Sequence, residues 1–282
     1  MKGDLLKTHA KSFYWASFFL SKKLYLKSSV LYSFCRTLDD IADGSDELEI
    51  KQEKFSNFKN DFINKNFNNL LIKKMWTVIK EVNISKKVVL DLFDGIETDL
   101  NEKVTLKSKK DLLVYSYRVA GTVGLMMSKI LKVENKEALK GAIDLGIAMQ
   151  LTNIARDVLE DKNKNREYIS YDFSAIIETI NNAEVFYKKS FPAISSIPLK
   201  SRFSVIVARR VYKKIGDHVL KQKNIENYNK SGKIYVPLTG KILETILSIT
   251  DFVKLLFIEN ISYDNDKNHS ILSQEINLNE RI

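Results

Sequence analysis

The sequence predicts an all-α protein, on three observations. The chain has only ten glycines and three prolines in 282 residues, whereas an all-β chain needs turn residues at short intervals. Apolar residues recur at three- and four-residue spacing through most of the chain, which is the periodicity of an amphipathic helix. Apolar side chains make up 44% of the residues and charged ones 28%, so a wholly disordered chain is excluded.

Eight segments have this helical periodicity, and polar breaks such as Gly44–Asp46, Asn83 and residues 224–232 separate them. Without an internal repeat or a composition break, residues 1–282 are expected to form a single domain, with a polar, loosely held tail over about 260–282. For residues 242–258, the most continuously apolar stretch, we favour a core or capping helix over a surface-seeking one. The expected helices cover residues 28–43, 52–81, 86–101, 109–132, 136–161, 172–191, 200–222 and 240–258.

Two features bear on the compartment. The single cysteine, Cys35, cannot form an intramolecular disulfide and belongs to no CxxC pair, which fits a reducing compartment. The first 20 residues lack an uninterrupted apolar core with a small-residue cleavage site, and no apolar run reaches the roughly 18 residues of a membrane span. A cytoplasmic protein, at most peripheral to a membrane, is expected.

The net charge is +10, from 45 Lys+Arg against 35 Asp+Glu. Nucleic-acid binding is disfavoured, because the cations are mostly scattered lysines without the arginine and aromatic clusters of phosphate and base readers. Locally, residues 1–36 are basic and the stretch from Asp39 is acidic. A cationic segment beside clustered carboxylates suits an anion held through a divalent metal.

The segment 30–43 (VLYSFCRTLDDIAD) carries the first polar stripe. At ~100° per residue, Tyr32, Arg36, Asp39 and Asp43 fall within an arc of about 60°, beside the apolar face. Two acids at i,i+4 are by themselves a weak signal. Solvent-facing charges normally lie opposite an apolar face, so their place here is informative.

The segment 145–161 (LGIAMQLTNIARDVLED) carries a second stripe. Here Gln150, Asn153, Asp157 and Asp161 span about 80° on the same geometry and again adjoin apolar residues. Like charges at i,i+4 repel, so two such pairs need a compensating cation. Oxygen ligands without histidine or cysteine select a hard ion, and Mg²⁺ shares its ligands readily with substrate phosphates.

The stripes therefore suggest two facing helices that bind a diphosphate through Mg²⁺. The alternative is two ordinary acidic helix faces with salt bridges. We favour the alternative for either stripe alone and the site for both together, since each also contains an arginine, Arg36 or Arg156.

At this point the sequence resembles the squalene/phytoene synthase family, whose members join two isoprenyl diphosphates head to head on an all-helical isoprenoid synthase fold around a central apolar cavity. The resemblance runs from about His9 to Lys241, and within the family it is closest to bacterial phytoene synthases. Six motifs in the family's order carry it: residues 9–13 (HAKSF), 35–43 (CRTLDDIAD), 115–124 (YSYRVAGTVG), 150–161 (QLTNIARDVLED), 166–170 (REYIS) and 233–237 (KIYVP).

The resemblance implies roles residue by residue. It makes Tyr115 and Tyr168 tyrosines near the reacting ends, although each could equally be a core tyrosine with one satisfied hydroxyl. Lys233 stands where relatives have arginine, which keeps the charge but loses the bidentate fork. The Mg²⁺ ligands would be Asp39, Asp43, Asn153, Asp157 and Asp161, and the substrate-binding residues would be His9, Lys11, Ser12, Phe13, Tyr32, Arg36, Gln150, Asn153, Arg156, Tyr212 and Lys233.

Small residues in the third motif have two interpretations that the sequence leaves open. Ala120, Gly121 and Gly124 either permit close helix packing or, by the family resemblance, line a tunnel for long isoprenyl chains.

The expected function is that of a Mg²⁺-dependent prenyltransferase, with Mn²⁺ as a substitute, that makes phytoene for carotenoid synthesis from two geranylgeranyl diphosphates. The reaction passes through a cyclopropyl diphosphate, and no NADPH is expected. The nearest alternative is a squalene, dehydrosqualene or presqualene diphosphate synthase that uses farnesyl diphosphate. A non-catalytic scaffold is disfavoured because both carboxylate sets are intact, and a terpene cyclase because of residues 115–124. The sequence leaves the oligomeric state open.

Overall fold

The computed structural model describes residues 15–258 and 267–282, and these residues confirm the all-α prediction. A π-helical turn, η1 (Tyr117–Gly121), and two short paired strands, β1 (Val104–Thr105) and β2 (Arg166–Glu167), interrupt the helices. The α-helices are α3 (Lys22–Asp43), α4 (Leu48–Ile63), α5 (Leu70–Val82), α6 (Lys86–Thr98), α7 (Lys109–Ser116), α8 (Thr122–Ile130), α9 (Lys136–Asn163), α10 (Phe173–Ala193), α11 (Leu199–Leu220), α12 (Ile225–Lys230), α13 (Leu238–Leu256) and α14 (Lys267–Ser273).

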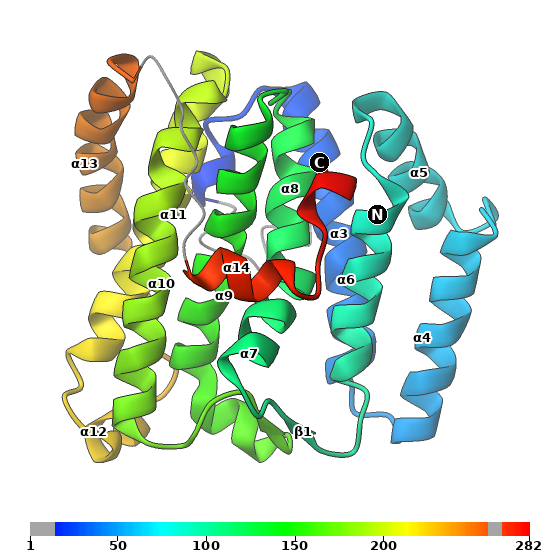
Figure 1. Cartoon of the computed structure of the whole chain (residues 1–282), viewed down its shortest axis with the longest axis horizontal. Helices are drawn as coiled ribbons and strands as arrows, with labels where there is room; N and C mark the ends of the chain where they lie inside the picture. Colours follow the sequence, from blue (N-terminus) through cyan, green and yellow to red (C-terminus); the bar gives the residue numbers. More distant parts are fainter. Residues whose placement is uncertain (1–14, 259–266) are drawn as a thin grey trace.

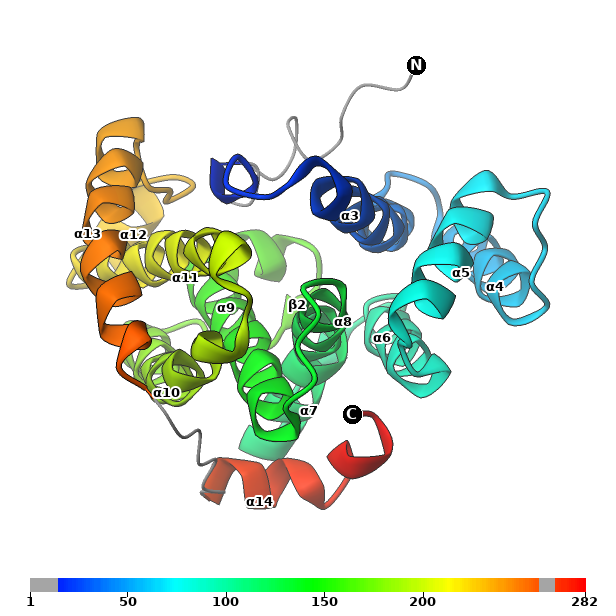
Figure 2. The ribbon, with the colours of Figure 1, turned by 90° about the horizontal axis from the view of Figure 1, so that it is seen from above.

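The long helix α9 lies in the middle of the bundle and packs against α8, α10, α11 and η1 (Figure 1). Along the longest axis, α4 and α5 form one end of the molecule and α13 forms the other. Seen from above, α3 and α14 lie on opposite sides of the layer that contains α8 and α9 (Figure 2). Helix α3, which carries one predicted polar stripe, packs against α8, and α8 packs against α9, which carries the other.

Side-chain caps explain where several helices begin. The side chains of Ser108, Asn135 and Asp172 accept hydrogen bonds of 3.1, 2.9 and 2.8 Å from backbone N–H groups three residues later. Each bond satisfies an amide that has no partner inside the helix. These caps set the first turns of α7, α9 and α10.

An aromatic cluster fixes the orientation of α3. Phe34 is fully buried, and its ring lies 5.6 Å from that of Phe62 and 5.7 Å from that of Phe93. Leu38, one turn later, is also fully buried. With this face held against α4 and α6, the stripe of Tyr32 to Asp43 stays at the border of the core.

The predicted helix over residues 52–81 is wrong as one element, because the chain turns between α4 and α5. Lys65 has a left-handed backbone with φ of 55°, which ends α4. Asn66 and Asn69 donate side-chain hydrogen bonds of 2.8 and 3.4 Å to Asp61, and the Asn69 side chain also caps α5. The asparagine-rich run 64–69 is therefore a built turn, and the apolar periodicity on both sides of it masked the break.

The predicted helix over residues 109–132 is likewise divided, by η1. Small residues on both sides allow η1 and α8 to pack closely against α9. A Cβ added at Gly124 of α8 would lie 2.2 Å from the carbonyl oxygen of Ala142, and one added at Gly146 of α9 would lie 2.2 Å from that of Ala120. Of the two interpretations of these residues, the structure supports helix packing at Gly124. The π-helical turn itself has no periodicity signal in the sequence.

Gly124→Ala should destabilise the fold, because its methyl group has to push backbone apart rather than a flexible side chain. We expect a loss of about 1–3 kcal/mol in the free energy of unfolding, measured by urea denaturation. Gly216→Ala is the matched control, since its Cβ would meet only side-chain atoms of Ile180 at 3.3 Å and 3.4 Å. Equal stability of the two variants would contradict the packing interpretation.

The prediction of a loosely held tail is wrong for residues 267–282. His269 is buried, and its Nε2 lies 2.9 Å from Oδ1 of the buried Asp144 on α9. Arg281 pairs with Asp91 of α6, with its Nε 3.0 Å from the Asp91 carboxylate. Buried apolar side chains, Leu272 and Ile276, alternate with the exposed polar ones whose number suggested a loose tail.

Candidate active site

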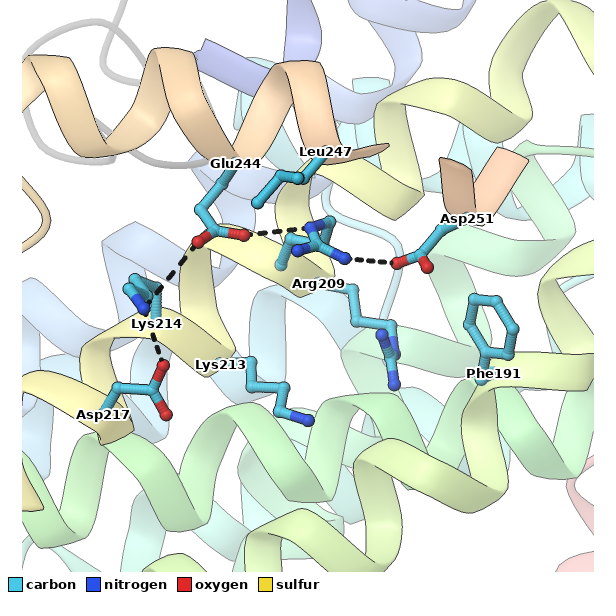
Figure 3. Close-up of a pocket in the computed structure, with 9 residues that line it drawn as sticks. Phe191, Arg209, Lys213, Lys214, Asp217, Glu244, Leu247 and Asp251 are labelled. Atoms are coloured by element: carbon cyan, nitrogen blue, oxygen red, sulfur yellow. Dashed lines mark hydrogen bonds and ion pairs between the residues drawn. The ribbon is translucent and has the colours of Figure 1, made fainter. Parts of the chain in front are cut away.

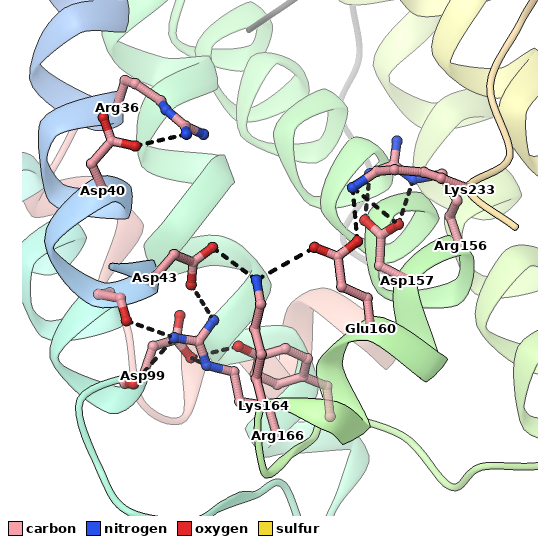
Figure 4. A network of polar contacts seen from close by, with 12 residues as sticks. Arg36, Asp40, Asp43, Asp99, Arg156, Asp157, Glu160, Lys164, Arg166 and Lys233 are labelled. Carbon is pink, nitrogen blue, oxygen red and sulfur yellow. Dashed lines mark hydrogen bonds and ion pairs between the residues drawn. The ribbon is translucent and has the colours of Figure 1, made fainter. Parts of the chain in front are cut away.

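Polar side chains of α3 and of α9 lie on the two sides of one network of polar contacts (Figure 4). On α3, Arg36 Nη2 forms an ion pair of 2.6 Å with Asp40 Oδ1. On α9, Arg156 Nε lies 2.8 Å from Asp157 Oδ1, and its Nη2 contacts the other carboxylate oxygen. Each stripe thus holds a guanidinium through a neighbouring carboxylate.

Basic residues beyond the end of α9 connect the two stripes (Figure 4). Asp43, the last residue of α3, accepts a hydrogen bond of 2.6 Å from Arg166 and one of 3.2 Å from Lys164. Lys164 also reaches Glu160 of α9 at 3.4 Å. Burial alone would raise the pKa of Asp43, but Arg166 and Lys164 lower it below its ordinary value. Asp43 therefore stays ionised.

The β1–β2 pairing positions Arg166. Its backbone lies opposite Val104 in a short parallel ladder, with Val104 N–H donating to the Asn165 carbonyl at 3.0 Å. The Arg166 side chain is 10% exposed and also donates to the backbone carbonyls of Ala42 and Asp99, at 3.3 Å each. One arginine thus ties α3, α6 and the loop after α9 together.

Tyr115 and Tyr168 both bind the Asp99 carboxylate at the end of α6. Their hydroxyls lie 2.8 and 2.5 Å from Asp99 oxygens and 3.0 Å from each other, and their rings stack with centroids 4.7 Å apart. Burial raises the pKa of each tyrosine, so both hydroxyls stay protonated. The structure brings the two tyrosines together as buried donors to Asp99, whose Oδ1 lies 3.9 Å from Nε of Arg166.

Asp39 and Asp161 have a different electrostatic environment from their partners. Burial, followed by the charge of Asp43, raises the pKa of Asp39 to about 7. Burial, followed by the charge of Asp157, raises the pKa of Asp161 to about 7 as well. Among the described residues neither carboxylate forms an ion pair, so each stripe contains one paired and one unpaired acid.

Two further polar atoms in the stripes have no partner among the described residues. They are the buried Nε of Arg36, a donor, and the buried Oδ1 of Asn153, an acceptor. An unpaired amide oxygen on the same helix stripe as Asp157 and Asp161 suits a hard cation, and an unpaired guanidinium donor suits an anion. Within 15–258 and 267–282 no three carboxylate, histidine or cysteine side chains converge on one point. The residue types fit a Mg²⁺–diphosphate site, and the role of the metal stays a prediction.

Other predicted binding residues lie around these stripes. Lys233 donates to Glu160 at 2.8 Å and lies 4.0 Å from Asp157, at an exposed position. Tyr212 of α11 is close enough to Arg156 and Asp157 for their charges to act on it, while burial raises its pKa. Burial also raises the pKa of Tyr32, to about 12. Gln150 accepts a hydrogen bond of 3.4 Å from Asn153. The predicted residues His9, Lys11, Ser12 and Phe13 lie outside the described residues.

Comparison with known proteins agrees with this geometry. The family model described as squalene/phytoene synthase matches residues 6–175, more than half of the chain. The chain belongs to the squalene/phytoene synthase family. This squalene/phytoene synthase domain is 28% identical over 246 residues to 15-cis-phytoene synthase from Pantoea ananas, covering 76% of this chain and 79% of that protein. It is 27% identical over 220 residues to 15-cis-phytoene synthase from Paracoccus sp., with 68% and 72% covered.

Solved structures show the same fold. A dehydrosqualene synthase in complex with a ligand superposes with a TM-score of 0.75 at 25% identity, over 89% of this chain and 94% of the other. A squalene synthase from Alicyclobacillus acidocaldarius superposes with a TM-score of 0.65 at 16% identity, over 77% and 91%. The predicted isoprenoid synthase fold is confirmed.

Reasoning from the sequence missed three residues of this polar network: Asp99, Lys164 and Arg166. Arg166 belongs to the motif 166–170 but had no predicted role, and Lys164 lies between the expected helices 136–161 and 172–191. Asp99 had a usable signal, since a carboxylate between Ile96 and Leu100 at the end of an apolar helix is costly to bury unless it is paired. The contacts among these three residues depend on the β1–β2 pairing, and strands of two residues have no recognisable sequence pattern.

The raised pKa values of Asp39 and Asp161 predict how the stability of this family member depends on pH in the presence of a chelator. Their folded-state pKa values of about 7 exceed the ordinary 3.8, so the folded state binds more protons and its stability falls as pH rises from about 4 to about 7. Asp43 has a lowered pKa and is already ionised throughout this window.

We therefore expect the Tm, measured by calorimetry with EDTA, to fall by at least about 3 °C between pH 5 and pH 8. Asp161→Asn should reduce this fall. A flat or rising Tm, with no difference between the variant and the natural chain, would show that ionisation of these two carboxylates does not destabilise the folded state.

Proposed function

We propose that this protein is a prenyltransferase that condenses two geranylgeranyl diphosphates to 15-cis-phytoene. The observation that carries the proposal is the pairing of two acid-and-guanidinium arrays, on α3 and α9, in a chain of the squalene/phytoene synthase family. Relatives at 27–28% identity that are named 15-cis-phytoene synthase support the choice of product.

The metal in this proposal is Mg²⁺, with Mn²⁺ as a substitute. Asp39 and Asp43 on one side, and Asn153, Asp157 and Asp161 on the other, would hold it through oxygen atoms. When bound, Mg²⁺ neutralises diphosphate charge and makes diphosphate a better leaving group. Binding would also relieve the repulsion that raises the pKa values of Asp39 and Asp161 to about 7.

The chain's own cations hold the departing anions. Arg156 and Lys233 flank Asp157, whereas Arg36 lies on α3, so the two arrays offer separate cationic positions for two diphosphates. Loss of the first diphosphate gives an allylic cation, which the double bond of the second substrate attacks to form a cyclopropyl diphosphate and release a proton. Loss of the second diphosphate, rearrangement and loss of another proton give the C40 triene without a reductant.

Apolar side chains protect the carbocation intermediates of this reaction from water. Val119, Val123 and Met127 succeed one another at four-residue spacing along η1 and α8, and all three are partly exposed although they pack against the core. In this proposal these side chains line the space in which the carbocations form and keep water from it. Tyr115 and Tyr168 add protonated hydroxyls fixed by Asp99.

A second candidate uses farnesyl diphosphate and makes dehydrosqualene by the same steps. The superposition on a dehydrosqualene synthase with a TM-score of 0.75 favours it. The shared carboxylate chemistry does not discriminate between C15 and C20 chains.

The test is incubation of the purified chain with farnesyl or geranylgeranyl diphosphate, with Mg²⁺, and identification of the lipid product by mass spectrometry. Phytoene from the C20 substrate, formed in preference to any C30 product, is the expected result. Dehydrosqualene as the main product would establish the second candidate. No condensation product from either substrate, by a chain whose helical spectrum is intact, would refute both.

Arg36→Ala should change the partition between intermediate and product. Its Nε has no partner among the described residues, so it is available to the second diphosphate when that group leaves. We expect the cyclopropyl diphosphate to accumulate relative to the C40 hydrocarbon in single-turnover analysis with labelled substrate. Lys87→Ala, which removes a half-exposed cation paired with Glu280 at 2.6 Å, is the control. A variant that makes less of both species in an unchanged ratio would show that Arg36 does not serve the second ionisation.

A further inference from the structure

Helix α13 has its polar and apolar faces reversed relative to an ordinary surface helix. Six apolar residues at three- and four-residue spacing fall within an arc of about 80° at ~100° per residue. Each is between 44% and 61% exposed, and together they are called the α13 stripe: Leu238, Ile242, Ile246, Ile249, Val253 and Leu256. Phe257, at the end of the helix, is 78% exposed.

The two acidic residues of α13 face the protein instead (Figure 3). Glu244 and Asp251 are buried, and their carboxylates lie 2.9 and 2.8 Å from the guanidinium of Arg210 on α11. The sequence predicted a core or capping helix for this segment. The helix does cap α11, but through ion pairs, and its apolar side is outside. Ion pairs fix which face is inward, so the exposure of the stripe is built into the fold.

The charges that remain near the outer face are positive. The four ionisable residues of α13 are Lys241, Glu244, Asp251 and Lys254, and both acids are turned inward. The Lys254 side chain is 69% exposed, and the whole chain carries a net charge of +10. An apolar stripe flanked by lysines and free of acids is complementary to a surface that is apolar below and anionic above.

The position of α13 suits a flat partner. It forms one end of the molecule, and none of the helices within residues 15–258 and 267–282 lies outside it (Figures 1 and 2). Aromatic side chains extend the patch: Phe18 is 61% exposed and packs edge-on against Trp15, whose indole N–H donates to Thr245 of α13 at 2.9 Å. Aromatic residues are favoured at membrane interfaces. No helix among the described residues has the length and apolar character to cross a bilayer.

We propose that α13 lies in the plane of a bilayer that contains anionic lipids, with the α13 stripe at the boundary between headgroups and acyl chains. A second copy of the chain fits less well, because two stripes face to face would bring lysines together, while the acids of α13, including Asp251 at 3.9 Å from Lys254, are turned inward toward Arg210. The inference rests in part on the proposed function, whose hydrocarbon product has no polar group and must leave into a lipid phase.

The test is flotation of the full chain with vesicles of phosphatidylcholine, alone or with phosphatidylglycerol. We expect flotation that increases with the anionic lipid. The variant Ile242→Gln/Ile246→Gln/Ile249→Gln should lose at least about tenfold in partition coefficient, because each replacement removes exposed apolar surface. The matched control, Ile63→Gln/Phe67→Gln/Leu70→Gln, alters three exposed apolar residues at the opposite end of the molecule and should float like the natural chain.

Three outcomes would overturn the inference: no flotation of the natural chain with either vesicle, equal loss in the two triple variants, or conversion of a dimer to a monomer by the α13 variant with flotation unchanged. Turnover with detergent-dispersed substrate separates this inference from the proposed function. Flotation without condensation would refute the function alone, and condensation without flotation would refute the bilayer contact alone.

Discussion

Asp39→Asn is expected to lower turnover at least about a hundredfold, since it removes an ionisable oxygen from the group of residues proposed to hold Mg²⁺ and diphosphate. The same change should raise stability in the absence of metal. The Asp39 carboxyl is buried next to Asp43 with a pKa of about 7, so above pH 7 its charge opposes folding, and a neutral amide of the same shape removes that cost.

Turnover with Mg²⁺ and the Tm with EDTA at pH 8 are the two measurements. We expect the Tm of the variant to exceed that of the natural chain by at least about 2 °C. Asp46→Asn is the control, because Asp46 lies just beyond α3 and pairs with Lys54 at the surface. Near-normal turnover of Asp39→Asn would remove this residue from the metal site, whereas lost turnover with a lower Tm would indicate simple misfolding.

Arg166→Met is expected to cause the largest loss of stability. It leaves the Asp43 and Asp99 carboxylates without their shared cation and removes donors from two backbone carbonyls. Asp43 is 40% exposed and keeps Lys164, so the main cost comes from Asp99, whose side chain is 8% exposed. Removing the cation from such a buried carboxylate costs about 3–5 kcal/mol, because the charge stays buried and unpaired. The Tm should fall by at least about 6 °C, and turnover should fall with it because Asp43 loses its position.

The control for Arg166 is Lys87→Met. Lys87 pairs with Glu280 at 2.6 Å, but both side chains are about half exposed, so the expected change is below about 1 kcal/mol. In the Arg166→Met background, Asp99→Asn should recover part of the lost stability, since it neutralises the more deeply buried acid. Equal stability of the two single variants, measured by urea denaturation, would contradict the bridging role of Arg166.

The polar stripes could be predicted from the sequence because they depend only on helical geometry. The spacing of Asp39 and Asp43, and of Asp157 and Asp161, places each pair on one face of a helix whatever the rest of the fold is. The apolar residues beside them predicted that these faces lie at the border of the core, as Phe34 and Leu38 confirm.

What the sequence did not predict depends on contacts between distant segments. The orientation of Arg166 follows from its pairing with Val104, 62 residues earlier by numbering, in strands of two residues each. The inward face of α13 follows from Arg210, a residue on another helix. Periodicity also gave no signal for the turn at Lys65, because an asparagine-rich run between two amphipathic helices continues their spacing.

The central claim is that the arrays on α3 and α9 bind an isoprenyl diphosphate through a divalent metal. Calorimetric titration of the natural chain with unreactive geranylgeranyl thiodiphosphate, in Mg²⁺ and then in EDTA, tests it most directly. We predict that removal of Mg²⁺ weakens binding at least about tenfold, and that Asp39→Asn and Asp157→Asn each reduce this difference. Equal affinity with and without Mg²⁺, for a chain that is folded in both buffers, would contradict the claim.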